Sequence, residues 1–176
     1  MNTIPLPDYC SARVLVLGCG NILFGDDGFG PEAIRYLKEN FKIPPWMCVI
    51  DAGLSAREIL FTVTLSSIRP QKIIIVDAVD AGKKPGEVFE LDISEIPLKK
   101  IDDFSMHQLP TSNLLRELKD FCGVDVKIIA IQVENIPDSV SPGISEKLIR
   151  SIPDVCKIIL EEEDKNARVE DYRIGC

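Results

Sequence analysis

Three acidic residues and the only histidine of the chain are the side chains best suited to chemistry. Asp27 lies in a glycine-rich segment behind the first apolar run, and Asp51 and Asp77 directly follow the second and third runs. The histidine, His107, comes later. Two carboxylates and one imidazole, with open positions for water or substrate, suit a hard or borderline divalent cation. Such a cation polarises a carbonyl group or lowers the pKa of a bound water. The best-placed candidates for a metal site are Asp27, Asp77 and His107.

Each of these residues also has an ordinary structural explanation. Asp26 and Asp27 precede a glycine, which is typical of a turn or a helix cap. Asp51 and Asp77 can simply end a strand, and a lone histidine is more often a hydrogen-bonded structural residue than a ligand. Cys19 lies beside the same turn and could be a soft ligand, but a small buried thiol is the more common role. Spacing alone leaves both explanations open.

The glycine-rich segment also allows a different function, the binding of a dinucleotide. Gly18 and Gly20 after an apolar run match the start of the G-x-G-x-x-G fingerprint, and Asp51 resembles the acid that binds the ribose. However, Leu23 occupies the position of the third glycine, where we expect it to crowd the helix against the strand. The two acids that follow would also stand where a helix N-terminus should meet pyrophosphate. Dinucleotide binding is therefore the weaker alternative.

Segments typical of strands alternate along the chain with segments typical of helices. The pattern predicts strands over 13–17, 47–50, 72–76, 87–91 and 126–133, and helices from Pro31, over 55–65 with a capping box at Ser55, over 111–121 and over 144–162 with a kink or break at Pro153. This order predicts an α/β fold, a three-layer structure with a twisted, mostly parallel sheet of about five strands and helices on both faces. Strand 87–91 follows a loop, so we expect it to be antiparallel. Ligands of such sheets bind beyond the carboxyl ends of the strands, where the acids lie.

Composition excludes several classes of protein. The 176 residues are 45% hydrophobic and 27% charged, which predicts one globular domain over 1–176, with a frayed charged end from about residue 161. A net charge of −8 disfavours nucleic acid as a partner. No apolar run is long enough for a membrane span, and no secretory signal is evident. The six cysteines form no CxxC pair, so we expect a cytoplasmic protein with reduced thiols.

Four segments resemble those of the [NiFe]-hydrogenase maturation endopeptidases. In chain order they are GCGNILFGDDGFG at 18–30, DAG at 51–53, IVDA at 75–78 and SMHQ at 105–108. Together they extend over most of the chain. Within the family, the sequence is most similar to the type that processes the coenzyme F420-reducing hydrogenase of methanogenic archaea.

The resemblance implies one peptide cut, made in the precursor of the hydrogenase large subunit. The family removes a C-terminal extension after nickel has been inserted, and its metal ligands fall on Asp27, Asp77 and His107 of this chain. The resemblance implies that nickel is presented by the precursor, with another divalent metal as a substitute in vitro. Some relatives carry glutamate at the first position, so the shorter Asp27 would hold the metal closer to the turn or through a bridging water.

Our hypothesis for the mechanism is that these three residues sense the nickel, so that only loaded precursor is positioned for cleavage. A metal-polarised water, with one acid as general base, would cut the peptide bond, and Asp51 is the candidate supporting acid. No serine or cysteine has an evident neighbouring base, which argues against a Ser–His or Cys–His peptidase. The chain could also be a nickel-binding escort or checkpoint protein that cleaves nothing. We expect a monomer that binds the precursor and neither nucleic acid nor a membrane.

Overall fold

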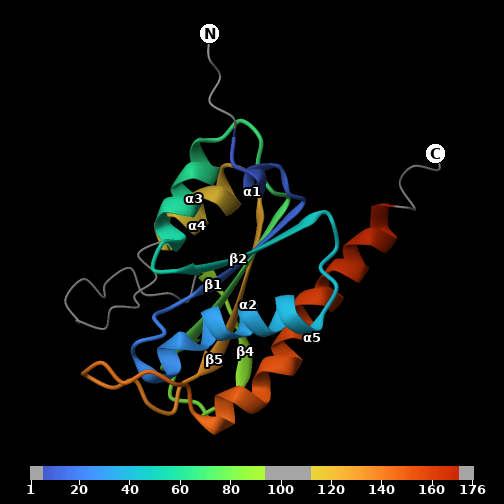
Figure 1. Cartoon of the computed structure of the whole chain (residues 1–176). Helices are drawn as coiled ribbons and strands as arrows, with labels where there is room; N and C mark the ends of the chain where they lie inside the picture. The colour runs from blue at the N-terminus through green and yellow to red at the C-terminus, as the bar shows by residue number, and fades with distance from the viewer. Residues whose placement is uncertain (1–5, 94–111, 171–176) are drawn as a thin grey trace.

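Five strands form one sheet in the computed structural model of the chain (Figure 1). The structure describes residues 6–93 and 112–170, with side chains for residues 6–93 and 114–161. In chain order the elements are α1 (Asp8–Ser11), β1 (Val14–Cys19), the 3-10 helix η1 (Gly25–Gly28), α2 (Phe29–Asn40), β2 (Met47–Gly53), α3 (Ala56–Leu65), β3 (Lys72–Val79), β4 (Val88–Leu91), α4 (Ser112–Asp120), β5 (Asp125–Gln132) and α5 (Glu146–Glu170).

The strand order is β2-β1-β3-β5-β4, and every neighbouring pair is parallel except the last. β4 runs antiparallel to β5, with Val88 opposite Ile131. The predicted α/β fold, the mostly parallel sheet and the antiparallel strand over 87–91 are therefore confirmed. Within the described residues, no helix combines the length and the apolar character that crossing a bilayer requires.

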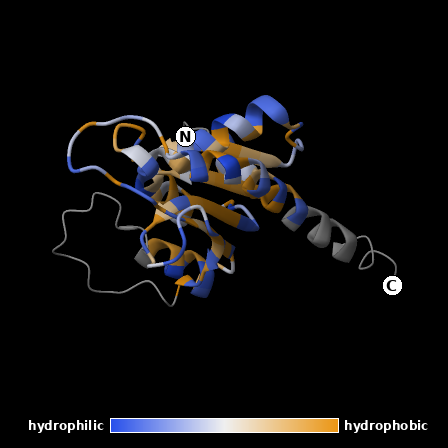
Figure 2. Cartoon of the chain, turned by 90° about the horizontal axis from the view of Figure 1, so that it is seen from below, coloured by the Kyte–Doolittle hydropathy of each residue, from blue (hydrophilic) through white to orange (hydrophobic). Residues whose placement is uncertain are grey.

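Helices cover both faces of the sheet because the side chains of a strand point alternately to its two sides. Val16 and Ile74 belong to the core beneath α2 and α5. Leu17 and Ile75, their neighbours in the chain, belong to the core beneath α3 and α4. Figure 2 shows the result as apolar strands enclosed between helices that are more hydrophilic on the outside. Because the sheet is buried on both faces, the sequences of its central strands are continuous apolar runs.

Several element boundaries differ from the prediction. β2 and β3 continue through Asp51 and Asp77 instead of ending before them. α2 begins at Phe29, so Pro31 occupies its third position, where the missing N–H still costs no helical hydrogen bond. Ser55 does precede α3, but its side chain makes no capping hydrogen bond, so the predicted capping box is wrong.

The last helix, α5, is longer than predicted, and the short helix α1 has no counterpart in the prediction. α5 continues through Pro153 and reaches Glu170, whereas the sequence pattern indicated an end near residue 162. Proline removes one backbone donor from a helix, but packing of one helix face against a core can offset that loss. α5 packs Leu148, Val155 and Ile159 into the core that it shares with α2.

Two glycines allow α2 to lie against the sheet with backbone touching backbone. A Cβ atom on Gly18 would lie 2.4 Å from the carbonyl oxygen of Gly30, and one on Gly30 would lie 2.2 Å from the carbonyl oxygen of Cys19. No larger residue fits at either position without a shift of the backbone. This close approach brings η1, which carries Asp27, into contact with β3.

Replacing Gly30 with alanine should destabilise the fold by about 3 kcal/mol, because the new Cβ would overlap backbone atoms that cannot rotate away. Gly82→Ala is the matched control. Gly82 has a φ of +70°, but no atom lies within 4 Å of the point that its Cβ would occupy, so we expect a loss of only about 1 kcal/mol. Urea denaturation measures both changes. Equal losses in the two variants would contradict the close approach of α2.

Candidate active site

Parallel strands bring two of the predicted acids to the same edge of the sheet. Gly18 of β1 lies beside Asp51 of β2 on one side and beside Val76 of β3 on the other. Asp77, the next residue of β3, therefore lies beside the end of β1. Asp77 is buried, with 3% of its surface exposed, and its Oδ1 accepts a hydrogen bond of 2.8 Å from the N–H of Ala78. Asp51 is exposed, so the two acids have different access to solvent.

The third predicted acid, Asp27, lies beside Gly20, the residue that directly follows β1. Asp27 is fully buried in η1, and its Oδ2 accepts a hydrogen bond from the backbone N–H of Asn21. A Cβ on Gly20 would lie 3.5 Å from that same Oδ2. Gly20 has a φ of +121°, which favours glycine, and its N–H donates a hydrogen bond of 3.2 Å to the carbonyl oxygen of Gly53. The turn thus ties Asp27 to the carboxyl edge.

The three acids act on one thiol, which indicates that they share one neighbourhood. Burial raises the pKa of Cys19 well above its ordinary value, and the negative charges of Asp77, Asp27 and Asp51 raise it further, in that order. Cys19 therefore stays protonated at neutral pH and is neither a thiolate nucleophile nor a thiolate ligand in this state. This confirms the expectation of a small buried thiol at that position.

His107 lies outside the described residues, so its place relative to the acids stays a prediction. Among the side chains that the structure describes, no three His, Cys, Asp or Glu groups form a set that could hold a metal ion. A metal bound by the buried carboxylates of Asp27 and Asp77 would therefore need a further ligand, either from the rest of the chain or from a substrate. As oxygen donors they suit a hard or borderline divalent cation.

Asp26, the neighbour of Asp27, has a different role. Its carboxylate accepts hydrogen bonds from the backbone N–H groups of Glu134 (2.7 Å), Asn135 (2.8 Å) and Ser145 (2.6 Å). Burial acts to raise the pKa of Asp26, but the hydrogen bonds from Ser145, Asn135 and Glu134 outweigh it and hold that pKa below its ordinary value. Asp26 thereby joins η1 to the loop between β5 and α5.

A buried glutamine that the sequence analysis did not single out shapes the loop after β3. The Oε1 of Gln132 accepts hydrogen bonds from the N–H groups of Ala81 (2.8 Å) and Lys83 (3.0 Å). Its Nε2 donates to Oδ1 of Asp80 at 3.0 Å. The signal was present in the sequence, because Gln132 is a polar residue at the end of a strongly apolar strand. Gln132 fixes the loop that follows Asp77.

The glycine-rich loop does not offer the phosphate-binding turn of a dinucleotide fold. The N–H of Asn21 is already bonded to the carboxylate of Asp27, which would repel a phosphate. The predicted crowding by Leu23 is wrong, because Leu23 is exposed and the close helix–strand contact belongs to Gly30. The side chain of Asn21 accepts a hydrogen bond of 3.0 Å from the N–H of Leu23 and holds the turn.

Large apolar side chains are exposed on the loops around the acids. They are Ile22 and Leu23 between β1 and α2, Leu54 after β2, and Ile136 and Val140 between β5 and α5. The sequence pattern did not predict this feature, because exposure of a loop residue depends on how separate loops meet. Apolar surface around polar groups is typical of a surface that binds a polypeptide.

Asp26→Asn should lower stability and reduce its dependence on pH. Because the pKa of Asp26 is depressed in the folded chain, its stabilising effect is present above the ordinary carboxyl pKa and is lost as the pH falls through the folded value. Asparagine keeps the shape but loses the charge, and its amide nitrogen replaces an oxygen that accepts a backbone N–H. At least one of the three hydrogen bonds is then lost, so we expect a loss of about 2 kcal/mol at neutral pH. Urea denaturation at neutral and acidic pH measures the effect.

The control for this prediction is Asp138→Asn, which changes an exposed acid on the same loop. We expect the stability of this variant to follow that of the original chain at every pH. If Asp26→Asn also followed the original chain, its carboxylate would not be the link between η1 and the loop.

Comparison with known proteins places the chain in one family. The hydrogenase maturation protease family matches residues 31–162. A Methanocaldococcus jannaschii protein named as a hydrogenase maturation protease is 38% identical over 154 residues, which are 86% of this chain and 97% of the relative. A Methanothermobacter thermautotrophicus protein named coenzyme F420 hydrogenase subunit delta is 37% identical over 155 residues, which are 86% of this chain and 94% of the relative.

The fold agrees with solved structures of the same kind. The hydrogenase maturating endopeptidase HybD from Escherichia coli superposes with a TM-score of 0.68 at 26% identity, over 88% of this chain and 93% of HybD. The [NiFe] hydrogenase maturation protease HycI from Thermococcus kodakarensis gives a TM-score of 0.66 at 25% identity, over 85% and 91% of the two chains. Because the family match spans most of the chain and these relatives align over nearly their whole length, the chain belongs to the hydrogenase maturation protease family and is a peptidase.

Proposed function

We propose that this peptidase removes a C-terminal extension from the precursor of a [NiFe]-hydrogenase large subunit after nickel has been inserted. The observation that carries the proposal is the pair of buried carboxylates, Asp27 and Asp77, which lie on η1 and β3, two elements that contact each other at the carboxyl edge of the sheet. In this proposal the nickel belongs to the substrate and arrives with the precursor. Exposed apolar side chains around the acids supply the surface for a polypeptide partner.

Recognition of the nickel follows from the charge of the site. Two carboxylates held near each other repel unless a cation or a proton lies between them. A nickel-loaded precursor brings such a cation, whereas an empty precursor does not, and specificity is the resulting difference in affinity. His107 is the proposed third ligand. In support, α4 follows His107 in the chain and packs on the face of the sheet whose core includes Ile75 and Cys19.

The chemistry is hydrolysis of one peptide bond. Water attacks the carbonyl carbon, a carboxylate within hydrogen-bond reach takes its proton, and that proton passes to the leaving amine as the C–N bond breaks. Bound nickel would supply Lewis-acid polarisation. Asp27 and Asp77 are the candidate bases, with Asp51 as the supporting acid that solvent can reach.

We further propose that the partner is the coenzyme F420-reducing hydrogenase of a methanogenic archaeon. Two observations support this narrower proposal. One relative from a methanogen carries the name of a subunit of the coenzyme F420 hydrogenase. Within the family, the sequence is also most similar to the type that processes this hydrogenase. Precursors of different hydrogenases, offered to the chain side by side, would test it.

Asp77→Asn, Asp27→Asn and His107→Ala should each abolish processing of nickel-loaded precursor and leave the fold intact. Each change removes one proposed ligand, and asparagine keeps the shape of the acid while losing its charge. The measurement is mass spectrometry of purified nickel-loaded precursor after incubation with each variant, where cleavage appears as loss of mass at the C-terminus. Normal cleavage by any of the three variants would show that the site is assigned incorrectly.

Asp80→Asn is the matched control, since it changes another acid near the end of β3. Oδ1 of Asp80 accepts hydrogen bonds from Nε2 of Gln132 and from the N–H of Gly82. The amide oxygen of asparagine can accept both, so processing should stay within about twofold of normal.

If the original chain bound loaded precursor without any loss of mass, the chain would be an escort or checkpoint protein instead.

A further inference from the structure

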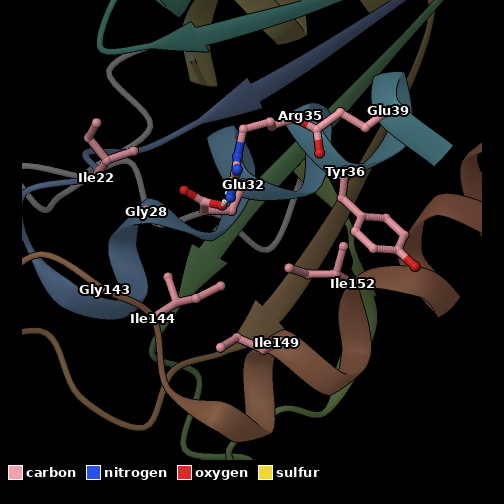
Figure 3. A pocket seen from close by; sticks show the side chains of 10 residues that line it. All are labelled: Ile22, Gly28, Glu32, Arg35, Tyr36, Glu39, Gly143, Ile144, Ile149 and Ile152. Atoms are coloured by element: carbon pink, nitrogen blue, oxygen red, sulfur yellow. Dashed lines mark hydrogen bonds and ion pairs between the residues drawn. The ribbon is translucent and has the colours of Figure 1, made fainter.

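We propose that a groove between α2 and α5 binds a short segment of the precursor that is apolar on one side and carries a basic residue on the other. The inference rests on the proposed function, because it concerns how the substrate of that function binds near the same site. The groove has a volume of about 360 Å³ and begins at Gly28, directly after Asp27. Figure 3 shows its side chains pointing toward one another from the two helices.

The α5 side of the groove is apolar. Ile144 and Ile152 line it, and Ile149 stands at its rim with 49% of its surface exposed. In Figure 3 these three side chains lie on the α5 side of the groove, across from Glu32 and Tyr36 of α2. A partly exposed isoleucine over an apolar floor gains free energy when an apolar side chain covers it.

The α2 side of the groove is charged and carries more acid than base. Glu32, Arg35 and Glu39 line it on successive turns of the helix. Arg35 forms an ion pair with Glu32, so this wall keeps an excess of one negative charge near Glu39. Since one wall is apolar and the other acidic, the complementary ligand has apolar groups on one side and a positive charge on the other.

The groove adjoins the segment that carries Asp27. Ile22 and Gly28 line it, and both belong to the segment between β1 and α2 that carries Asp27. From Gly28 at the end of η1 to Glu39 of α2, the groove lining extends over about 16 Å, which corresponds to about five residues of an extended peptide. A polypeptide that lies in the groove is therefore next to the segment that carries Asp27.

The occupant is part of the precursor and not a second copy of this chain. The chain carries a net charge of −8, so two copies would repel each other across an acidic wall. A precursor docked at Asp27 would lie near Gly28, which follows Asp27 in the chain and lines the groove. Binding a segment there adds affinity without a separate encounter, because the two contacts belong to one partner.

Ile149→Glu tests the groove, since it places a charge on the apolar wall without touching the acids. We expect the KM for nickel-loaded precursor to rise at least tenfold while kcat changes less than twofold. Phe121→Glu is the matched control, because Phe121 is 86% exposed at the end of α4 on the other face of the sheet. Its KM should stay within twofold of normal. Circular dichroism confirms that both variants fold.

Glu39→Lys tests the charged wall independently and should also raise the KM, because it repels the basic residue of the segment. A normal KM in Ile149→Glu, or an equal rise in Phe121→Glu, would overturn the groove as the docking site. A change of oligomeric state in Ile149→Glu, seen by analytical ultracentrifugation with a normal KM, would assign the groove to a second copy. Failure of the original chain to cleave the precursor would instead contradict the proposed function.

Discussion

Burial of two negative charges near one another is the constraint around which this fold is arranged. Asp27 and Asp77 both lie out of solvent, and their charges reach the thiol of Cys19. Holding like charges together inside a protein is costly unless a group of opposite charge offsets their repulsion. The close approach of α2 through Gly18 and Gly30 keeps Asp27 beside the end of β1. In our proposal the nickel of the substrate supplies the positive charge. Loaded precursor then relieves the repulsion between the two acids and empty precursor does not, so the site distinguishes the two.

Adjacent acids in the same short helix divide two tasks between them. The carboxylate of Asp26 accepts three backbone hydrogen bonds from the far loop and is a structural link. Asp27 accepts the N–H of Asn21 and lies beside the end of β1. Asp26 therefore anchors the short helix that carries Asp27. The same link holds the loop between β5 and α5, whose exposed apolar residues border the acids, so that one buried carboxylate shapes both the site and its surroundings.

The sheet and the position of Asp77 could be predicted from the sequence, because apolar runs followed by acids place those acids at one edge. The different roles of Asp26 and Asp27 could not be predicted, because both acids precede the same glycine. Asp26 binds a residue more than a hundred positions away in the chain, whereas Asp27 binds a residue of the local turn. The role of Leu23 was also misjudged, because local spacing does not show that the close helix–strand contact falls at Gly30, in the helix that begins at Phe29. Contacts between distant loops depend on the tertiary fold, which periodicity does not encode.

Anomalous diffraction at the nickel edge, from crystals of the chain in complex with nickel-loaded precursor, tests the central claim most directly. Our account predicts one strong peak beside Cys19, with oxygen atoms of Asp27 and Asp77 at coordinating distance. The same peak should be absent from crystals of a variant in which both acids are replaced by asparagine. A nickel peak at another place on the chain, or no peak at these two carboxylates, would contradict the account.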